Sequence, residues 1–198
     1  INSGYSISLS SDGNTVAISA PFFSGNGLYS SGQVRVYKNV SGVWTQIGLP
    51  IDGENTLDSF GTSISLSSNG EIIAATSPRN TENGTGTGNV RIFQNISGVW
   101  TQIGSDIYGN NVNKGCFKVS LSSNGNVVAI SSIEDNGDDS GKGFVRIFQN
   151  ISGVWTQIGS TLYGEANGDK FGYSISLSDT GDILVVSAKD NSTNFLYS

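Results

Sequence analysis

An acidic run near residue 135 carries the side chains best suited to hold a metal ion. Four carboxylates fall within six positions there, namely Glu134, Asp135, Asp138 and Asp139. Calcium takes six to eight oxygen ligands, several of them from carboxylates, so this loop and its backbone oxygens could bind that ion. The spacing matches no fixed calcium-binding pattern, and a solvated acidic loop is the alternative. The sequence therefore predicts no cofactor, with calcium at this loop as the alternative.

A second set of carboxylates occupies two matching segments, with Asp52, Glu54 and Asp58 in one and Glu165 and Asp169 in the other. Two carboxylates at a set separation could hydrolyse a glycosidic bond. However, Asp58 and Asp169 each lie two residues before a Phe-Gly pair, and a catalytic pair should be unique to one site. We expect these recurring acids to cap turns.

Histidine is absent, which removes the commonest general base and the commonest transition-metal ligand. Together with the recurrence of the acids, this predicts that the protein is not an enzyme and has no catalytic residue. A fragment of a carbohydrate-active enzyme is the less favoured alternative, since it would require an acidic cluster unique to one cleft.

Arginine and tryptophan recur at matching positions along the chain. These are Arg35, Arg91 and Arg146, and Trp44, Trp100 and Trp155. An arginine between apolar neighbours on a strand is expected to bury its stem and to pair with a loop carboxylate. A ring of ligand-binding arginines is the alternative. Each tryptophan is expected to fill a gap between neighbouring sheets, burying about 200 Å².

Three asparagines, Asn39, Asn95 and Asn150, each begin an Asn-X-Ser sequence. This sequence is the acceptor for N-glycosylation in secreted eukaryotic or viral proteins, and here it falls at predicted hairpin tips. Asparagine and serine are also ordinary turn residues, so a purely structural role is the alternative.

The composition argues against several classes of partner. The net charge is −6 and only ten lysines and arginines are scattered along the chain, whereas nucleic-acid binding requires clustered cations. No stretch approaches the roughly 18 apolar residues of a membrane span. Cys116 is the only cysteine, so stability must come from packing and not from an internal disulfide. The lack of methionine and of a visible signal peptide predicts a mature product or a fragment.

An internal repeat organises the chain. The octapeptide SGVWTQIG occurs three times, with its tryptophans 56 and 55 residues apart. The tripeptide SLS occurs four times, centred on Leu9, Leu66, Leu121 and Leu177. We divide this single array into repeats at about residues 4–60, 61–115 and 116–171, with a partial fourth repeat at about 172–198.

Each repeat is predicted to form four antiparallel strands. In the first repeat these cover residues 5–10, 15–20, 33–39 and 43–48. The first strand alternates apolar side chains with serines, the second is almost wholly apolar, and Asp-Gly and Ser-Gly pairs suit the hairpin turns. Such meanders are typical of β-propeller blades, with the serine-lined strand nearest the axis. A stacked β-solenoid or an open array is the alternative.

Several of these motifs resemble FG-GAP repeats, the blades of integrin-type propellers. The resemblance rests on the Phe-Gly pairs that begin at Phe60 and Phe171 and on Ser19-Ala20-Pro21 with the VAI before it. The fuller repeat also resembles repeat proteins found among the secreted and surface proteins of marine bacteria and in large viruses. It implies a propeller and an extracellular or particle-surface location.

The chain departs from this family in two places. The third repeat has Gly115-Cys116 where the others have Phe-Gly. Integrin-type blades often carry an Asp-rich calcium loop between their first two strands, but the corresponding segments here are short turns with too few carboxylates. The resemblance therefore implies no calcium at those turns.

The pattern as a whole favours a non-enzymatic binding or adhesion module on a cell or particle surface, because propellers place recognition in variable loops. The expected partner is a protein or a glycan, with neither nucleic acid nor membrane insertion involved. A spacer, shell or filament subunit is the alternative, since the near-identical outer strands could dock a partner by strand addition. Self-association or packing against further repeats of a longer chain would suit either role.

Overall fold

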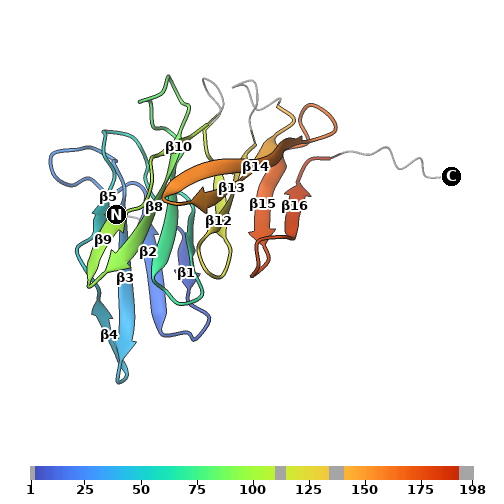
Figure 1. Ribbon diagram of the computed structural model, residues 1–198. Helices are drawn as coiled ribbons and strands as arrows, with labels where there is room; N and C mark the ends of the chain where they lie inside the picture. Colours follow the sequence, from blue (N-terminus) through green and yellow to red (C-terminus); the bar gives the residue numbers. More distant parts are fainter. Residues whose placement is uncertain (1–2, 110–114, 134–140, 192–198) are drawn as a thin grey trace.

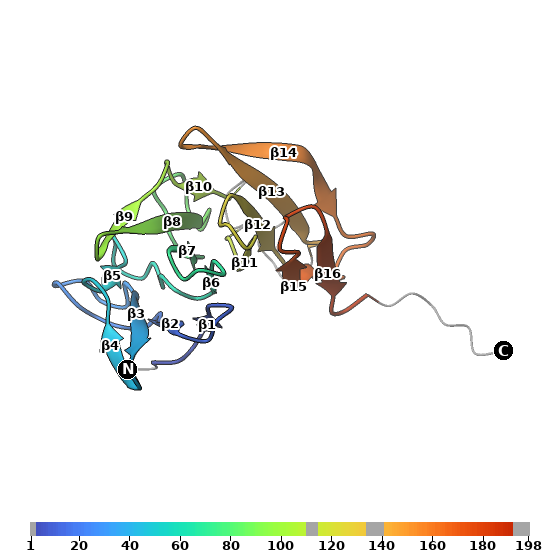
Figure 2. The same cartoon turned by 60° about the horizontal axis from the view of Figure 1, so that its bottom comes forward.

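The computed structural model describes residues 3–109, 115–133 and 141–191, which form sixteen β-strands and no helix. The strands make four antiparallel sheets that fan out around a common centre (Figures 1 and 2). No helix that could cross a membrane occurs in this described part of the chain.

The strands fall into three blades and the inner half of a fourth. Blade 1 contains β1 (Ile7–Leu9), β2 (Thr15–Ala20), β3 (Gln33–Val40), β4 (Val43–Gln46) and β5 (Ile51–Asp52). Blade 2 contains β6 (Ile64–Leu66), β7 (Ile72–Ser77), β8 (Asn89–Ile96), β9 (Val99–Gln102) and β10 (Ile107–Tyr108). Blade 3 contains β11 (Lys118–Leu121), β12 (Val127–Ser132), β13 (Phe144–Ile151) and β14 (Val154–Tyr163). The half blade contains β15 (Phe171–Leu177) and β16 (Leu184–Ala188).

Each blade is a meander that runs outward from the centre. Consecutive strands pair antiparallel, so that β1, β6, β11 and β15 lie innermost while β4, β9 and β14 lie at the periphery (Figure 2). This is the all-β arrangement of propeller blades that the repeat pattern predicts. The tight hairpins within each sheet distinguish it from a solenoid, whose strands are parallel.

The fourth strand, predicted over residues 43–48, ends at Gln46, and the predicted return segment begins with a further short strand, β5. In blade 1, β4 and β5 both pair with β3, and in blade 2, β9 and β10 both pair with β8. The first break contains Gly48, with φ of 71°, and Pro50, which has no amide hydrogen to donate. In blade 3 the same stretch is the single strand β14, with a register shift between Val145 and Ile147.

Apolar cores fill the spaces between neighbouring blades. The second strand explains how one blade serves two cores: on β7, Ile73 and Ala75 pack towards blade 1, whereas Ile72 and Ala74 pack towards blade 3. Side chains on a strand alternate between its two faces, so a strand that is buried on both faces must be apolar throughout. The sequence pattern of the second strand is accounted for by this double burial.

Serine hydroxyls link the inner strands from blade to blade. Ser8 Oγ accepts a hydrogen bond from Leu66 N at 2.9 Å, and Ser65 Oγ accepts one from Leu121 N at 3.0 Å. Ser120 Oγ accepts in the same way from Leu177 N at 3.0 Å. The serines are thus the acceptors that the next inner strand needs, in addition to being small enough for the crowded centre.

Two tryptophans fill gaps between blades as predicted, and the third does not. Trp100 and Trp155 pack against the two cores and donate Nε1–H to the carbonyls of Ile47 and Ile103 in the preceding blade. Trp44 is 47% exposed, because no described residues form a blade ahead of blade 1. The prediction of three equivalent environments is therefore wrong for Trp44.

The two ends of the blades are built differently. At the lower end in Figure 1, short turns join the strands, and in the two-residue turn between β3 and β4, Ser41 and Gly42 have the positive φ values of a type I′ turn, 54° and 87°. At the upper end lie the longer loops after β2 and β7 and the segment that enters β6.

Candidate ligand-binding site

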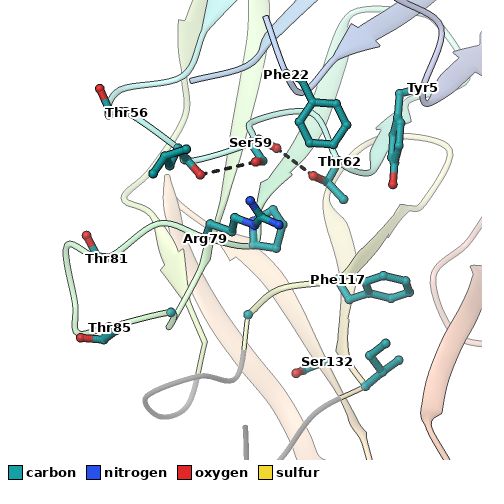
Figure 3. A pocket seen from close by; sticks show the side chains of 15 residues that line it. Tyr5, Phe22, Thr56, Ser59, Thr62, Arg79, Thr81, Thr85, Phe117 and Ser132 are labelled. Atoms are coloured by element: carbon teal, nitrogen blue, oxygen red, sulfur yellow. Dashed lines mark hydrogen bonds between the residues drawn. The ribbon is translucent and has the colours of Figure 1, made fainter. Parts of the chain in front are cut away.

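A pocket of about 780 Å³ opens at the upper end of the inner strands, between blades 1, 2 and 3. We call it the mouth pocket and define it by its main side chains, Tyr5, Phe22, Thr62, Arg79 and Phe117. Figure 3 shows Tyr5 and Phe22 together, Phe117 across from them, and Arg79 entering from a third side. Aromatic rings, hydroxyls and one cation therefore face a common space.

The pocket exists because one repeat position changes size. The residue that enters the inner strand is aromatic in three repeats, at Tyr5, Phe117 and Tyr173, but is Thr62 in blade 2. Tyr5 packs edge-on against Phe22 with ring centroids 5.8 Å apart, and Phe117 packs on Tyr173 at 5.9 Å. The smaller threonine leaves space between these two aromatic pairs.

A second variable position supplies the cation. The residue two positions after the end of the second strand is Phe22 in blade 1, Arg79 in blade 2 and Asp190 in the half blade. Arg79 is exposed, and among the described residues its guanidinium has no hydrogen-bond or ion-pair partner. It is therefore available to a ligand that carries an acid group.

Hydroxyl groups complete the wall of the pocket. Thr62 donates to the carbonyl of Ser59 at 2.8 Å, and Ser59 and Leu57 both adopt positive φ values, 56° and 70°. These contacts hold the segment that enters blade 2 in a fixed, compact turn. Thr56, Thr81 and Thr85 are exposed on the rim, where their hydroxyls could donate to or accept from a polar ligand.

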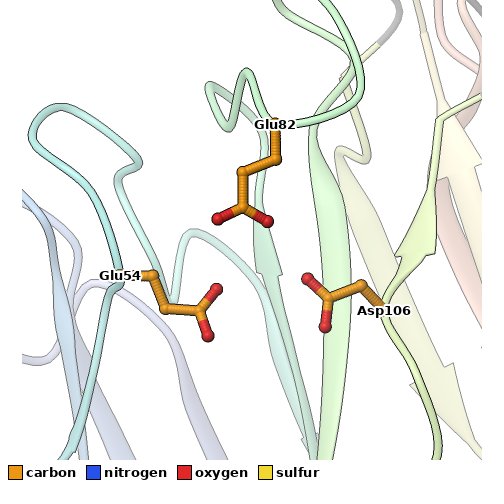
Figure 4. A group of neighbouring side chains, drawn as sticks. All are labelled: Glu54, Glu82 and Asp106. Carbon is orange, nitrogen blue, oxygen red and sulfur yellow. The ribbon is translucent and has the colours of Figure 1, made fainter.

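Three carboxylates meet at the upper edge between blades 1 and 2. Figure 4 shows Glu54, Glu82 and Asp106, whose carboxylate oxygens lie within 4.8 Å of one another. Each is already engaged by protein groups: Arg91 forms a 3.1 Å ion pair with Glu54, Tyr108 donates to Glu82, and Gln102 donates to Asp106. These contacts make the cluster part of the junction between the two blades.

The electrostatics of this cluster reflect crowding of like charges. Burial raises the pKa of Glu54, Arg91 opposes that rise, and the carboxylates of Asp106 and Glu82 add to it. Burial, the charge of Asp106 and the hydrogen bond to Glu82 together raise the pKa of Tyr108 to about 12. The guanidinium of Arg91 therefore supplies the charge that keeps the carboxylates together.

The recurring arginines occupy two kinds of surroundings. Arg91 and Arg146 are buried, lie over phenylalanine rings and donate to main-chain carbonyls of the preceding blade, those of Asp52 and Tyr108. Arg35 is exposed and donates to Gln33 in its own strand. The structure therefore brings none of the three into the mouth pocket.

The remaining predicted positions lie away from the mouth pocket. Asn39 Oδ1, like its counterparts Asn95 and Asn150, accepts from the glycine amide of its hairpin turn at the lower end. Glycosylation there stays a prediction. The acidic run Glu134, Asp135, Asp138 and Asp139 lies outside the described residues.

The carboxylates of the matching segments do not form a pair in one cleft. Asp58 and Asp169 are buried, and each accepts from a main-chain amide three residues earlier, at Asn55 and Ala166. Asp52 accepts from the side chains of Asn26 and Gln33. Glu165 is exposed. These contacts are those of turn and loop stabilisation.

Cys116, which replaces the glycine of the Phe-Gly pair, is a packing residue. It is 1% exposed within the core between blades 2 and 3, and burial raises the pKa of its thiol to about 12. A protonated, buried thiol is chemically inert.

The sequence interpretation did not select Tyr5, Phe22, Thr62, Arg79 or Phe117. A signal for two of the positions was present: aligned repeats show that they differ where neighbouring positions agree. Glu82 and Asp106 were also missed, because they lie in a loop and at a strand break whose approach depends on how two blades pack.

Comparison with solved structures assigns the fold to the propeller type. A candidate 6-phosphogluconolactonase from Bacteroides fragilis is 17% identical, with a TM-score of 0.55 over 82% of this chain and 39% of its own. Kuenenia stuttgartiensis hydrazine synthase is 12% identical, with a TM-score of 0.57 over 91% of this chain and 42% of its own. The chain thus spans about two-fifths of each, and identities this low show the fold alone. No protein-family model and no curated protein matches the chain.

Proposed function

We propose that this propeller segment is a non-enzymatic binding module that takes an acidic saccharide in the mouth pocket. The observation that carries the proposal is the exposed Arg79 guanidinium, which is unpartnered among the described residues and stands beside two aromatic groups. A guanidinium pairs in a two-pronged geometry with carboxylate or sulfate groups.

The other side chains of the pocket suit the rest of a sugar. The exposed rings of Tyr5 and Phe22 offer apolar faces on which the C–H face of a pyranose can pack. Threonine and serine hydroxyls match the donors and acceptors of sugar hydroxyls. The described lining supplies no carboxylate, so binding is favoured over acid-base hydrolysis, which would need a pair of them.

We extend the proposal to blade type and setting. Gly61 and Gly172, the glycines of the two Phe-Gly pairs, have φ of 88° and 91°, and a Cβ on either would lie within 3.0 Å of a serine Cβ in the preceding blade. Glycine is thus favoured at these two junctions, although Cys116 occupies the same position between blades 2 and 3, and the two glycines support assignment to FG-GAP-type repeats. That family implies an extracellular or particle-surface location, where acidic glycans are common partners.

The test is an array of matched neutral, carboxylated and sulfated oligosaccharides, probed with the chain and with Arg79→Gln. We expect retention of acidic members and a loss of about tenfold or more in affinity for Arg79→Gln. Arg35→Gln is the matched control, since Arg35 is also exposed but lies outside the pocket. Retention that is equal for neutral and acidic members, or unchanged in Arg79→Gln, would contradict the proposal.

A further inference from the structure

Blade 1 exposes the face whose counterparts on blades 2 and 3 are buried. We call this the open face and define it by Ile7, Leu9, Arg35 and Trp44. Ile7 and Leu9 are 67% and 57% exposed, whereas the equivalent Ile64 and Leu66 are 6% and 7% exposed. Blades 1 and 2 carry the same side chains at these positions, so the difference in exposure comes from whether a preceding blade covers them.

The two covered faces, one between blades 1 and 2 and one between blades 2 and 3, are held by the same kinds of contact. Trp100 and Trp155 donate to the carbonyls of Ile47 and Ile103 at 3.0 and 2.9 Å. Arg91 and Arg146 donate to the carbonyls of Asp52 and Tyr108 at 2.8 and 2.5 Å. These acceptors are main-chain groups at corresponding places on the outer strand of the preceding blade.

The inner strands add a third contact of the same kind. The amides of Ile64 and Leu66 donate to Ser6 and Ser8, and those of Val119 and Leu121 donate to Ser63 and Ser65. Tryptophan, arginine and amide donors therefore act together, and in these three contacts the donor lies on the later blade of the pair. On blade 1 the same donors belong to Trp44, Arg35 and the amides of Ile7 and Leu9. The amides of Ser11 and Ser68 donate in the other direction, to the carbonyls of Ser68 and Ser123.

We propose that the open face binds a further blade of this same repeat type. The proposal rests on continuity with the two interfaces already present, and it does not depend on the mouth pocket binding a saccharide. The partner blade must place an outer-strand carbonyl at Trp44, a second carbonyl at Arg35, and inner-strand serine hydroxyls at the amides of Ile7 and Leu9. Arg91 also pairs with Glu54, so an acid at that position of the partner would pair with Arg35.

A second copy of this chain meets these requirements only in part. The half blade, at the opposite edge of the arc, offers Ser174 and Ser176 on β15. Among the described residues of its two-stranded sheet, no outer strand provides the carbonyls that Trp44 and Arg35 would need. The open face therefore fits a complete four-stranded blade better than it fits the far edge of a copy.

The test adds one blade to the full chain and compares the same residue in two positions. Residues 3–60 are placed directly before Gly4, which recreates the Phe-Gly junction that joins blade 1 to blade 2. In this extended chain the inner copy of blade 1 has a preceding blade and the outer copy has none. Trp100→Phe and Trp155→Phe, with Trp44→Phe in either copy, leave one tryptophan as reporter.

The inner Trp44 is expected to emit at shorter wavelength and to be less accessible to acrylamide than the outer one. Arg35→Ala in the inner copy should lower the urea midpoint as much as Arg91→Ala does, whereas in the outer copy it should have little effect. A second extended chain, with residues 116–171 before Gly4 and Trp155→Phe in both copies, places a different blade ahead of Trp44, and its Trp44 is compared with that of the original chain. If neither extended chain buries the Trp44 that follows the added blade, the proposal is wrong. Burial of Trp44 in the original chain that rises with concentration, together with dimers in sedimentation, would overturn it in favour of a second copy.

Discussion

The contacts between blades and the mouth pocket lie in the same three blades, yet they are built by opposite rules. Between blades, the arginine, tryptophan and serine side chains recur from repeat to repeat and mostly bind main-chain groups. In the mouth pocket, equivalent positions carry different side chains, such as Phe22 and Arg79, or Tyr5 and Thr62.

The difference follows from what each region contacts. A main-chain carbonyl is present whatever the side chain, so a donor that uses it can be repeated without specifying the neighbour's sequence. A ligand is recognised by side chains. If every repeat carried the same pocket residues, each junction between blades would offer the same site, and no single junction would be specific for the ligand. Repetition therefore maintains the scaffold, and departures from it mark the position where specificity is expected.

The largest expected effect comes from removing a contact between blades. Arg91→Ala should lower the free energy of unfolding by about 2–3 kcal/mol, since it leaves the Asp52 carbonyl and Glu54 without their donor. Arg35→Ala should change it by no more than about 0.5 kcal/mol, because Arg35 is exposed. Urea unfolding of both variants measures the contrast, and equal losses would remove the distinction between covered and open faces.

The next effect concerns the mouth pocket. Thr62→Phe restores the aromatic residue found at this position in the other repeats, so the ring should occupy the space between Tyr5 and Phe117. Affinity for acidic saccharides should fall at least about tenfold while the urea midpoint changes little. Calorimetry with a carboxylated oligosaccharide tests this expectation. An unchanged affinity would show that the ligand binds elsewhere.

A smaller loss is expected from the serine links. Ser65→Ala removes the acceptor of the Leu121 amide and should cost about 1 kcal/mol, because that amide is left unsatisfied in a buried strand. Ser176→Ala is the matched control, since Ser176 is exposed and the described residues provide no following inner strand for it. Thermal unfolding of the two variants should differ, and equal stability would mean that the links contribute nothing.

The smallest effect is a pH dependence at the lower turns. Hydrogen bonds from Ser10 and from the amide of Asn14 lower the pKa of Asp12 from 3.8 to about 2. A lowered carboxyl pKa stabilises the fold above pH 3.8, and this contribution is lost as the pH falls through about 2. Asp12→Asn should keep the turn, because Asn69 and Asn124 accept main-chain hydrogen bonds at the corresponding turns. It should also reduce the loss of stability as the pH falls from 4 to 2.

Thermal midpoints between pH 4 and pH 2 provide the measurement. The reciprocal change, Asn69→Asp, should increase the loss of stability over this pH range, since Asn69 accepts hydrogen bonds at the corresponding turn. Parallel pH curves for the original chain and both variants would show that these turns do not contribute to acid sensitivity.

The sequence by itself determined the repeat, the antiparallel meander and the double burial of the second strand. These follow from local patterns: alternation with serines on β1 and β6, apolar runs on β7, and turn pairs such as Ser41-Gly42. Each pattern acts within one repeat, so a period of about 56 residues is enough to reveal it.

Only the tertiary structure decided which copies of a repeated residue are buried and which side chains share a pocket. Arg35 and Arg91 have the same place in the repeat but different neighbours, so their burial depends on whether a blade precedes them. Tyr5, Arg79 and Phe117 lie far apart in sequence and meet because three blades converge on one axis. Burial and shared space are properties of packing between repeats, and no pattern within a single repeat contains them.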